Sequence, residues 1–384
     1  MKKELELYIH IPFCVKKCAY CDFLSGPSTP EGIETYVAAL IKEIKAYSSM
    51  ALEHVVTTIF FGGGTPSTLS GAQMQKIMNV LREVFQISEQ AEISMEANPG
   101  TVTEENLKSY KMAGINRISF GLQTANNEEL KVLGRIHTYE QFLESFAMAR
   151  QAGFDNINVD LISAIPNQTV ESWEKSLHKV LERKPEHISA YSLIIEEGTP
   201  FAKWYGEGAE KEGELPTEEV EREIYHRTEE ILKENGYYRY EISNYAKKGK
   251  ECRHNLGYWE RKEYLGLGLG ASSLIENQRF HNIEDLTQYI ECEGNLEILC
   301  CDREILSEQE QMEEFIFLGL RKMKGISKQE FQCLFGKTLE DCYEDNIERM
   351  KQKKLIEEAD GYLRLTKQGI DLSNYVFAEI LCVK

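Results

Sequence analysis

Strand-like and helix-like segments alternate regularly through the first half of the chain, and this alternation most constrains the fold. Helix-like stretches of roughly ten to fifteen residues separate apolar runs of strand length. The six runs are residues 5–11, 57–61, 91–96, 117–121, 157–162 and 187–193. Strands joined by such helices form parallel sheets. Six units rather than eight predict an α/β fold, an incomplete (β/α)6 TIM-like barrel that is open along one side.

The residues with unusual chemistry follow the ends of these predicted strands. Cys14, Cys18 and Cys21 follow the first strand, and a glycine-rich segment, 62–66, follows the second. The polar residues at the next three strand ends are Glu96, Gln123 and Asp160. In a βα barrel the C-terminal strand ends and their loops form the functional face. The sequence therefore places a candidate site at one rim.

The three cysteines are spaced C-x3-C-x2-C, with Tyr20 inside the motif. Thiolates are the preferred ligands of iron–sulfur clusters, so three of them can hold three corners of a [4Fe–4S] cubane. The fourth iron then stays open to a small molecule. A zinc site is the alternative, but zinc usually takes four protein ligands, and no second pair follows here.

Gly62-Gly63-Gly64-Thr65-Pro66 can form a tight turn or let a ligand approach the backbone closely. It lacks the Gly-Lys-Ser/Thr ending of a phosphate loop and the G-x-G-x-x-G pattern of a dinucleotide site. The residues alone leave both the turn and the binding interpretation open.

The cysteine motif resembles the signature of radical S-adenosylmethionine (SAM) proteins, in which the open iron chelates SAM. Further segments resemble, in order and context, SAM-contacting positions of the coproporphyrinogen-oxidase-like branch of that family. The resemblance implies a SAM site formed by Tyr8, Tyr20, Gly63, Gly64, Thr65, Glu96, Gln123, Arg135 and Asp160. Physically, carboxylates can bind ribose hydroxyls, and an arginine can pair with the SAM carboxylate.

Composition limits the partners. The 384 residues carry a formal net charge of −19, which disfavours a nucleic-acid backbone as the main partner. No apolar run reaches the length of a membrane span, and the start of the chain lacks the pattern of a signal peptide. Ten cysteines without a regular framework are typical of reduced thiols, so we expect a cytoplasmic location.

The alternation is lost between about residues 200 and 300. Within this part, residues 237–300 are rich in aromatic residues and glycine and are predicted to be a poor helix but a plausible lining for a flat apolar ligand. His254 lies there, and neutral imidazole is a common axial ligand of haem iron. A lone histidine among aromatics is more often a packed core residue. However, His254-Asn255-Leu-Gly-Tyr258-Trp259 resembles the H-N-x-x-Y-W motif of the haem chaperone HemW family, which implies that His254 binds haem.

Residues 301–384 are predicted to form a separate winged-helix-like domain. Three helices precede a hairpin with an Asp360-Gly361 turn, and one final helix is expected over residues 367–381. This part carries 13 Lys and Arg against 17 Asp and Glu, a balance that disfavours DNA as its ligand. The expected division is therefore a barrel at 1–236, a connecting segment at 237–300 and this domain at 301–384.

Two functions compete within the family. The oxygen-independent coproporphyrinogen III dehydrogenase carries a further cysteine two residues after the third, where this chain has Phe23, and an extension before its first strand. The resemblance to HemW therefore implies a haem chaperone that passes haem to acceptor haem proteins, with a homodimer as a further possibility. A regulatory nucleic-acid-binding protein is the weaker third alternative because of the charge balance.

Overall fold

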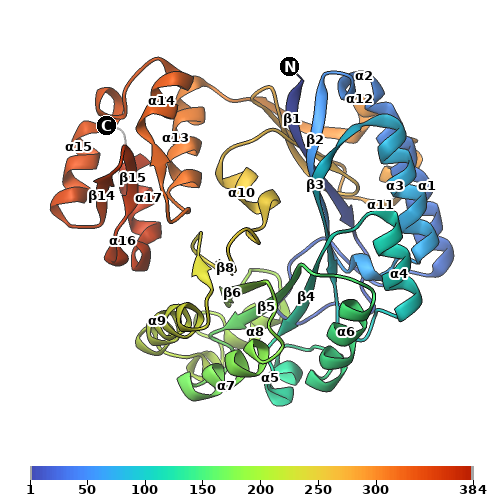
Figure 1. Ribbon diagram of the computed structural model, residues 1–384, viewed down its shortest axis with the longest axis horizontal. Coiled ribbons are helices and arrows are strands. Elements are labelled where there is room, and N and C mark those ends of the chain that lie inside the picture. The colour runs from blue at the N-terminus through green and yellow to red at the C-terminus, as the bar shows by residue number, and fades with distance from the viewer. Residues whose placement is uncertain (1, 382–384) are drawn as a thin grey trace.

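One open twelve-stranded sheet organises residues 2–381, the part of the chain that this computed structural model describes (Figure 1). Its centre is six parallel strands in chain order: β1 Lys3–Ile11, β2 His54–Gly63, β3 Gln86–Ala97, β4 Arg117–Gln123, β5 Ile157–Ser163 and β6 His187–Ser192. The edges of the sheet, β12 and β7, do not pair with each other. The predicted incomplete barrel is confirmed.

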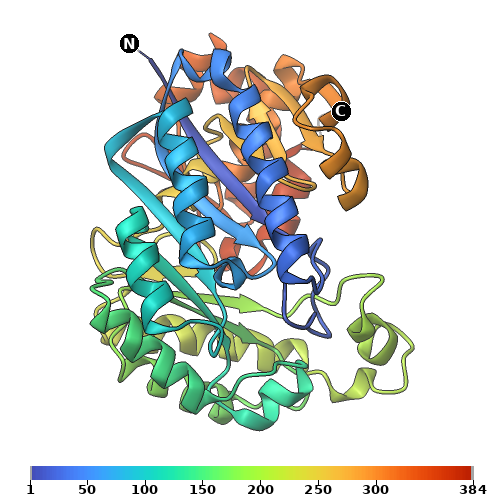
Figure 2. The same cartoon turned by 90° about the vertical axis from the view of Figure 1, so that its right-hand side faces the viewer.

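The connecting helices cover the outer face of these strands, where α1, α3 and α4 lie side by side (Figures 1 and 2). They are α1 Pro30–Ala46, α2 Ser48–Ala51, α3 Gly71–Val84, α4 Glu104–Ala113, α5 Asn127–Val132, α6 Tyr139–Gln151, α7 Val170–Leu181, α8 Pro200–Tyr205 and α9 Glu218–Glu234. Two short 3-10 turns occupy Pro66–Thr68 and Glu212–Glu214. Most of the long helices begin at a side-chain cap, as at Thr103, whose hydroxyl accepts from the Asn106 amide.

Side chains alternate along each strand between an apolar outer face and a polar inner face. On β1, Leu5, Leu7 and Ile9 are buried in the core under the helices. On β4 and β5 the intervening residues, such as Ser119 and Asp160, line the interior of the barrel. The period of two follows from the pleat of a strand. The hydrophobic core therefore lies outside the sheet, and the interior is polar.

Residues 237–300 extend this sheet, and α10 Arg253–Trp259 within them faces the interior of the barrel. The added strands are β7 Tyr238–Arg239, β8 Asn244–Ala246, β9 Tyr264–Leu267, β10 Ser272–Ile275, β11 Gln278–Asn282 and β12 Cys300–Ile305. Beside β1, β9 runs parallel, and β10 to β12 follow antiparallel. The expectation of a poor helix is wrong at α10 Arg253–Trp259, because the Glu92 carboxylate on β3 accepts from the Arg253 and His254 amides and caps that helix.

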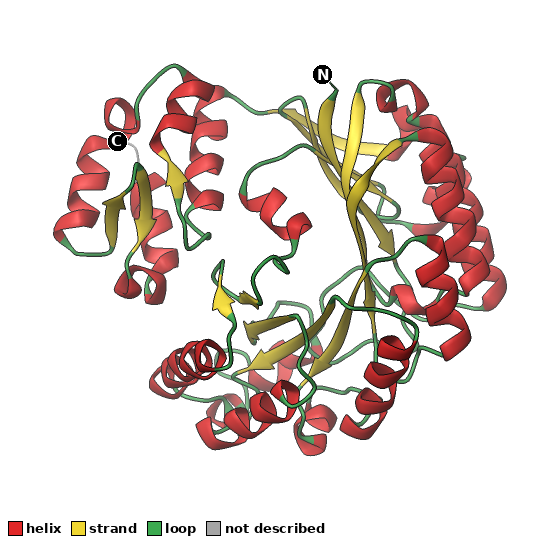
Figure 3. Ribbon diagram, viewed as in Figure 1, coloured by secondary structure: helices red, strands yellow, loops and turns green. Residues whose placement is uncertain are grey.

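The C-terminal part has its own apolar core and lies on the far side of α10 from the sheet (Figures 1 and 3). Its elements, after α11 Leu286–Glu291 and α12 Leu296–Leu299, are α13 Glu308–Gly319, β13 Ile326–Ser327, α14 Lys328–Phe335, α15 Leu339–Gln352, β14 Ile356–Ala359, β15 Tyr362–Leu365, α16 Lys367–Asp371 and α17 Ser373–Leu381. Asp360 and Gly361 both have positive φ in the predicted hairpin turn.

The single final helix predicted over residues 367–381 is wrong. The chain leaves helical geometry at Leu372, with φ −117° and ψ 29°, so α16 and α17 are separate helices. The break follows Asp371, whose carboxylate pairs with His226 on α9 at 2.9 Å. The division of the chain at residues 236 and 300 stays a prediction. No helix among residues 2–381 combines the length and the apolar character that a bilayer crossing requires.

Glu43 on α1 makes hydrogen bonds that connect the barrel to the segment containing β9 to β12. The contribution of this carboxylate to stability can be tested through its pH dependence. Its buried carboxylate accepts from Gly268 N at 2.9 Å, Asn282 Nδ2 at 2.7 Å and the Tyr289 hydroxyl. Burial is the main cause that raises its pKa to about 7. A raised carboxyl pKa contributes stability below the unfolded value, and that contribution is lost as pH rises through about 7.

We therefore expect the free energy of unfolding to fall between pH 5 and pH 8, with Glu43 adding a slope of at most about 1.4 kcal/mol per pH unit. Urea unfolding of Glu43→Gln should show a smaller fall than wild type. Glu105→Gln, on the exposed start of α4, is the control and should keep the wild-type fall. An unchanged pH dependence in Glu43→Gln would contradict this assignment.

Candidate functional site

The three cysteines lie on the loop after β1, each half-buried with a free thiol. Backbone bonds fix the loop, from Cys14 N to Gly26 O and from Ala19 N to Leu133 O. Burial is the largest cause that raises the pKa of Cys21, and the neighbouring Cys18 and Cys14 add to it. This raised pKa favours the thiol when no metal is bound, and a bound cation would have to outweigh it to hold Cys21 as the thiolate.

The donor set fits a cluster better than a single ion. Among the described residues, no three His, Cys, Asp or Glu side chains gather closely enough to hold one metal ion. A cubane spreads its cysteines over different corners, because each thiolate binds its own iron. Two sulfurs already face donors, with Cys14 Sγ 3.2 Å from Thr65 Oγ1 and Cys18 Sγ 3.4 Å from Arg135 Nη1.

The glycine-rich segment begins at the end of β2 and is hydrogen-bonded to the start of the cysteine loop. Gly64 N donates to Ile11 O at 2.9 Å, and Thr65 N donates to Phe13 O at 2.7 Å. A Cβ on Gly64 would lie 2.7 Å from Phe13 O, and Gly63 has a φ of 103°. The close contact at position 64 leaves no room for a Cβ, and the positive φ at position 63 favours glycine. Packing against the cysteine loop thus explains these glycines without any ligand, and it brings Thr65 to Cys14.

Tyr8, Glu96 and Asp160 face a common space inside the barrel. They line a cavity of about 170 Å³ together with Phe60, Arg117 and residues of α10. Burial, and then the charge of Asp160, raises the pKa of Glu96 to about 8. Asp160 itself accepts from Ser119 Oγ at 2.6 Å and from Asn158 Nδ2 at 2.7 Å.

Arg135 joins the rim to the cysteine loop. Its Nη2 donates to Gly121 O and to Asn98 Oδ1, both at 2.6 Å. Gln123 has a φ of 72°, and its amide lies over Gly121. Tyr20 packs edge-on against Phe201, with ring centroids 6.2 Å apart. The predicted residues thus form two groups, one at the cysteine loop and one around the cavity.

Sequence reasoning missed Asn98, Arg117, Ser119, Asn158, Ser189 and Tyr191. Five of these line the cavity, and Asn98 contacts Arg135 and Thr65. A signal existed for part of this set, since polar and apolar residues alternate in 117–121 and 157–160. The side of the strand that each polar residue faces becomes known only from the fold.

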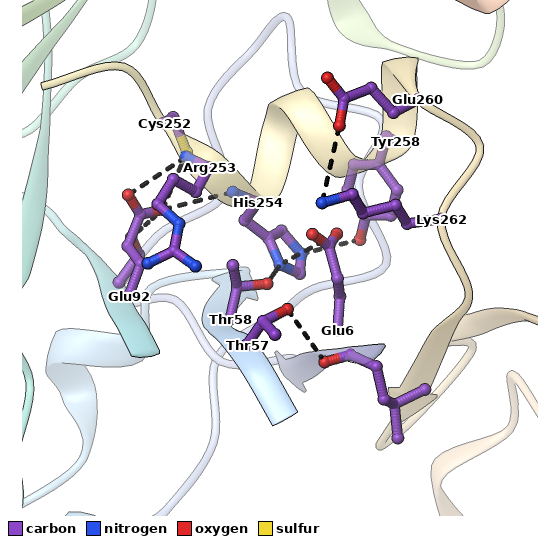
Figure 4. Close-up of polar contacts among 12 residues, drawn as sticks. Glu6, Thr57, Thr58, Glu92, Cys252, Arg253, His254, Tyr258, Glu260 and Lys262 are labelled. Carbon is purple, nitrogen blue, oxygen red and sulfur yellow. Dashed lines mark hydrogen bonds and ion pairs between the residues drawn. The ribbon is translucent and has the colours of Figure 1, made fainter. Parts of the chain in front are cut away.

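His254 lies on α10 with its ring pointing toward β1 and β2, and it is buried to 1% exposure (Figure 4). Thr58 Oγ1 lies 2.7 Å from its Nδ1, and the Tyr258 hydroxyl lies 3.0 Å from its Nε2. Burial, and then the charge of Arg117, lowers the pKa of His254 to about 3. The ring is therefore neutral, stacked on Phe60 at 5.2 Å, and closed off from solvent.

Helix α10 packs closely against Glu6 of β1 in the region around His254. The Glu6 carboxylate lies 3.8 Å from His254 Nδ1, and burial raises the pKa of Glu6 to about 8. A Cβ on Gly257 would come within 1.9 Å of Glu6 Oε1. Any larger residue at position 257 would have to displace the buried Glu6 carboxylate, and the haem role of His254 stays a prediction.

Comparisons with known proteins agree over most of the chain. The family model described as the radical SAM superfamily matches residues 8–180, and the model described as the HemN C-terminal domain matches residues 306–372. The chain is 36% identical to the heme chaperone HemW of Lactococcus lactis, over 99% of this chain and 98% of that protein. The chain is 37% identical to the heme chaperone HemW of Bacillus subtilis, over 97% of this chain and 98% of that protein.

The solved structure of coproporphyrinogen III oxidase (HemN) from Escherichia coli, described as a radical SAM enzyme, superposes with a TM-score of 0.86. The match covers 99% of this chain and 91% of that one, at 24% identity. Identity at this level supports the shared fold, and it leaves the activity open.

Proposed function

We propose that this chain, which belongs to the HemW family of radical SAM proteins, is a haem chaperone that binds haem and transfers it to acceptor haem proteins. The observation that carries the proposal is its similarity, over nearly its whole length, to relatives named heme chaperones. A homodimer and a cytoplasmic location remain predictions.

The proposal includes a SAM-binding [4Fe–4S] cluster, which the radical SAM family implies. Cys14, Cys18 and Cys21 would hold the cluster, which supplies an electron and an open iron when bound. Arg135 would pair with the SAM carboxylate, and Glu96 and Asp160 would accept hydrogen bonds from ribose hydroxyls. The remaining predicted SAM contacts are Tyr8, Tyr20, Gly63, Gly64, Thr65 and Gln123.

The coproporphyrinogen III dehydrogenase is the second candidate, favoured by the fold that the chain shares with HemN. Against it stands Phe23, which is 62% exposed at the position where that enzyme carries a further cysteine. An exposed phenylalanine supplies neither a ligand nor a proton at that position.

Haem binding at His254 requires α10 to move. The cavity beside His254 has a volume of about 170 Å³, and pockets for drug-sized ligands span about 300–1,000 Å³. Because both ring nitrogens already have partners, ligation of iron must replace one of them. The neutral imidazole favours this exchange, since no proton competes with the iron at neutral pH.

Haem titration of the anaerobically reconstituted protein, followed in the visible spectrum, tests this proposal. We expect a stoichiometric Soret band that His254→Ala strongly weakens. Tyr258→Phe should keep or strengthen haem binding, because it frees His254 Nε2 without removing the ring. His281→Ala, at a partly exposed histidine on β11, is the matched control and should bind as wild type.

Two outcomes would count against the proposal in different ways. No haem binding by the wild type would overturn the chaperone function itself. Normal binding by a folded His254→Ala protein would keep the function and reject His254 as the ligand.

A further inference from the structure

One amide side chain connects the donors that face two of the cluster cysteines. Asn98, which follows β3, donates from Nδ2 to Thr65 Oγ1 at 2.8 Å and accepts from Arg135 Nη2 at 2.6 Å through Oδ1. Thr65 in turn faces Cys14 Sγ, and Arg135 faces Cys18 Sγ. The chain of contacts is therefore Cys14, Thr65, Asn98, Arg135 and Cys18.

The direction of every bond in this chain is determined once Cys14 is a thiolate. Because the Thr65 hydroxyl accepts from Asn98, its one proton is free to point at Cys14. A thiolate sulfur only accepts, so Thr65 is the donor there once Cys14 binds iron. Arg135 has only donors, and its contact with Oδ1 determines which end of the Asn98 amide is the oxygen.

Hydrogen bonds to the main chain of Asn98 fix the position from which its side chain extends. Asn98 N donates to Ser67 Oγ at 3.2 Å, and Asn98 O accepts from Thr101 Oγ1 at 2.7 Å. Gly121 leaves just enough room on the other side, because a Cβ there would lie 3.0 Å from Asn98 Oδ1. The anchored backbone and the close approach of Gly121 thus place the Asn98 side chain between Thr65 and Arg135.

We propose that Asn98 is a positioning residue that orients Thr65 toward Cys14 and Arg135 toward Cys18, and that it thereby raises the reduction potential of the cluster. Hydrogen bonds to cluster sulfurs stabilise the more negative, reduced state. The inference rests on the proposed cluster. It also couples the potential to SAM binding, because Arg135 is the predicted partner of the SAM carboxylate.

Substitutions at Asn98 separate its two contacts. Asn98→Leu has a similar size and loses both, so we expect a lower midpoint potential and SAM binding weakened about tenfold or more. Asn98→Asp still accepts from Arg135 but accepts from Thr65 as well, which turns the hydroxyl proton away from Cys14. It should bind SAM nearly as wild type while its potential falls.

The potential is read by redox titration followed by electron paramagnetic resonance, with iron and sulfide content measured on the same samples. Thr65→Val, which adds no charge, should also lower the potential, and Asn98→Asp in that background should lower it less than in wild type. Asn156→Leu, before β5 and with an Oδ1 that makes no hydrogen bond, is the control.

A wild-type potential in cluster-loaded Asn98→Asp and Thr65→Val would overturn the inference. Absence of a [4Fe–4S] signal in the wild-type protein would instead reject the proposed cluster. If Asn98→Leu assembles no cluster, the other two variants decide the matter alone.

Discussion

Replacing Cys18 by alanine is expected to abolish the [4Fe–4S] cluster. Three thiolates are the only protein ligands that the motif offers, and the loss of one leaves two irons without a protein ligand. Iron and acid-labile sulfide in anaerobically reconstituted protein should fall to background, together with the broad absorption of the cluster. Circular dichroism should stay as in wild type, because Cys18 lies half-buried on a loop outside the core.

The matched control is Cys333→Ala, an exposed thiol on α14 in the C-terminal domain. That variant should keep its full iron content. A Cys18→Ala protein that still assembles the cluster would show that the ligands are not those of the C-x3-C-x2-C motif.

Replacing Arg135 by leucine is expected to weaken SAM binding by about 10- to 100-fold. A hydrogen bond to a charged partner contributes about 1.5–3 kcal/mol, and each 1.4 kcal/mol is a factor of ten. The Arg135 guanidinium is held by Gly121 O and Asn98 Oδ1, so it meets the ligand already oriented. Isothermal titration of the cluster-loaded protein with SAM measures the change.

Arg135→Lys keeps the charge but loses the two parallel donors of the guanidinium. Its affinity for SAM should therefore lie between that of wild type and that of Arg135→Leu. Lys131→Leu, at an exposed residue on α5, is the control for removal of a nearby charge. SAM binding that is equal in wild type and in Arg135→Leu would remove Arg135 from the site.

The barrel could be predicted because its strands are long and separated by periodic helices. Five of the six predicted runs lie wholly within β1 to β5, and the sixth, 187–193, extends one residue beyond β6. Helix caps are local as well, since Ser307 and Ser327 each accept from the amide three residues further along the chain. Local chemistry was enough for these elements.

The edge strands could not be predicted, because β7 to β11 are only two to five residues long. Such segments show no periodicity. Helix α10 depends on Glu92, about 160 residues earlier in the chain. In the candidate site, strand-end position identified Glu96 and Asp160, whereas the role of Asn98 depends on partners from two other loops.

Haem transfer from the loaded protein to an apo-haem protein tests the central claim most directly, with coproporphyrinogen III, SAM and a reductant supplied to the same preparation in parallel. The account predicts that the acceptor gains its Soret band while the protein loses haem, and that no vinyl porphyrin forms. Vinyl porphyrin at catalytic turnover, without haem transfer, would contradict it and make the chain a dehydrogenase.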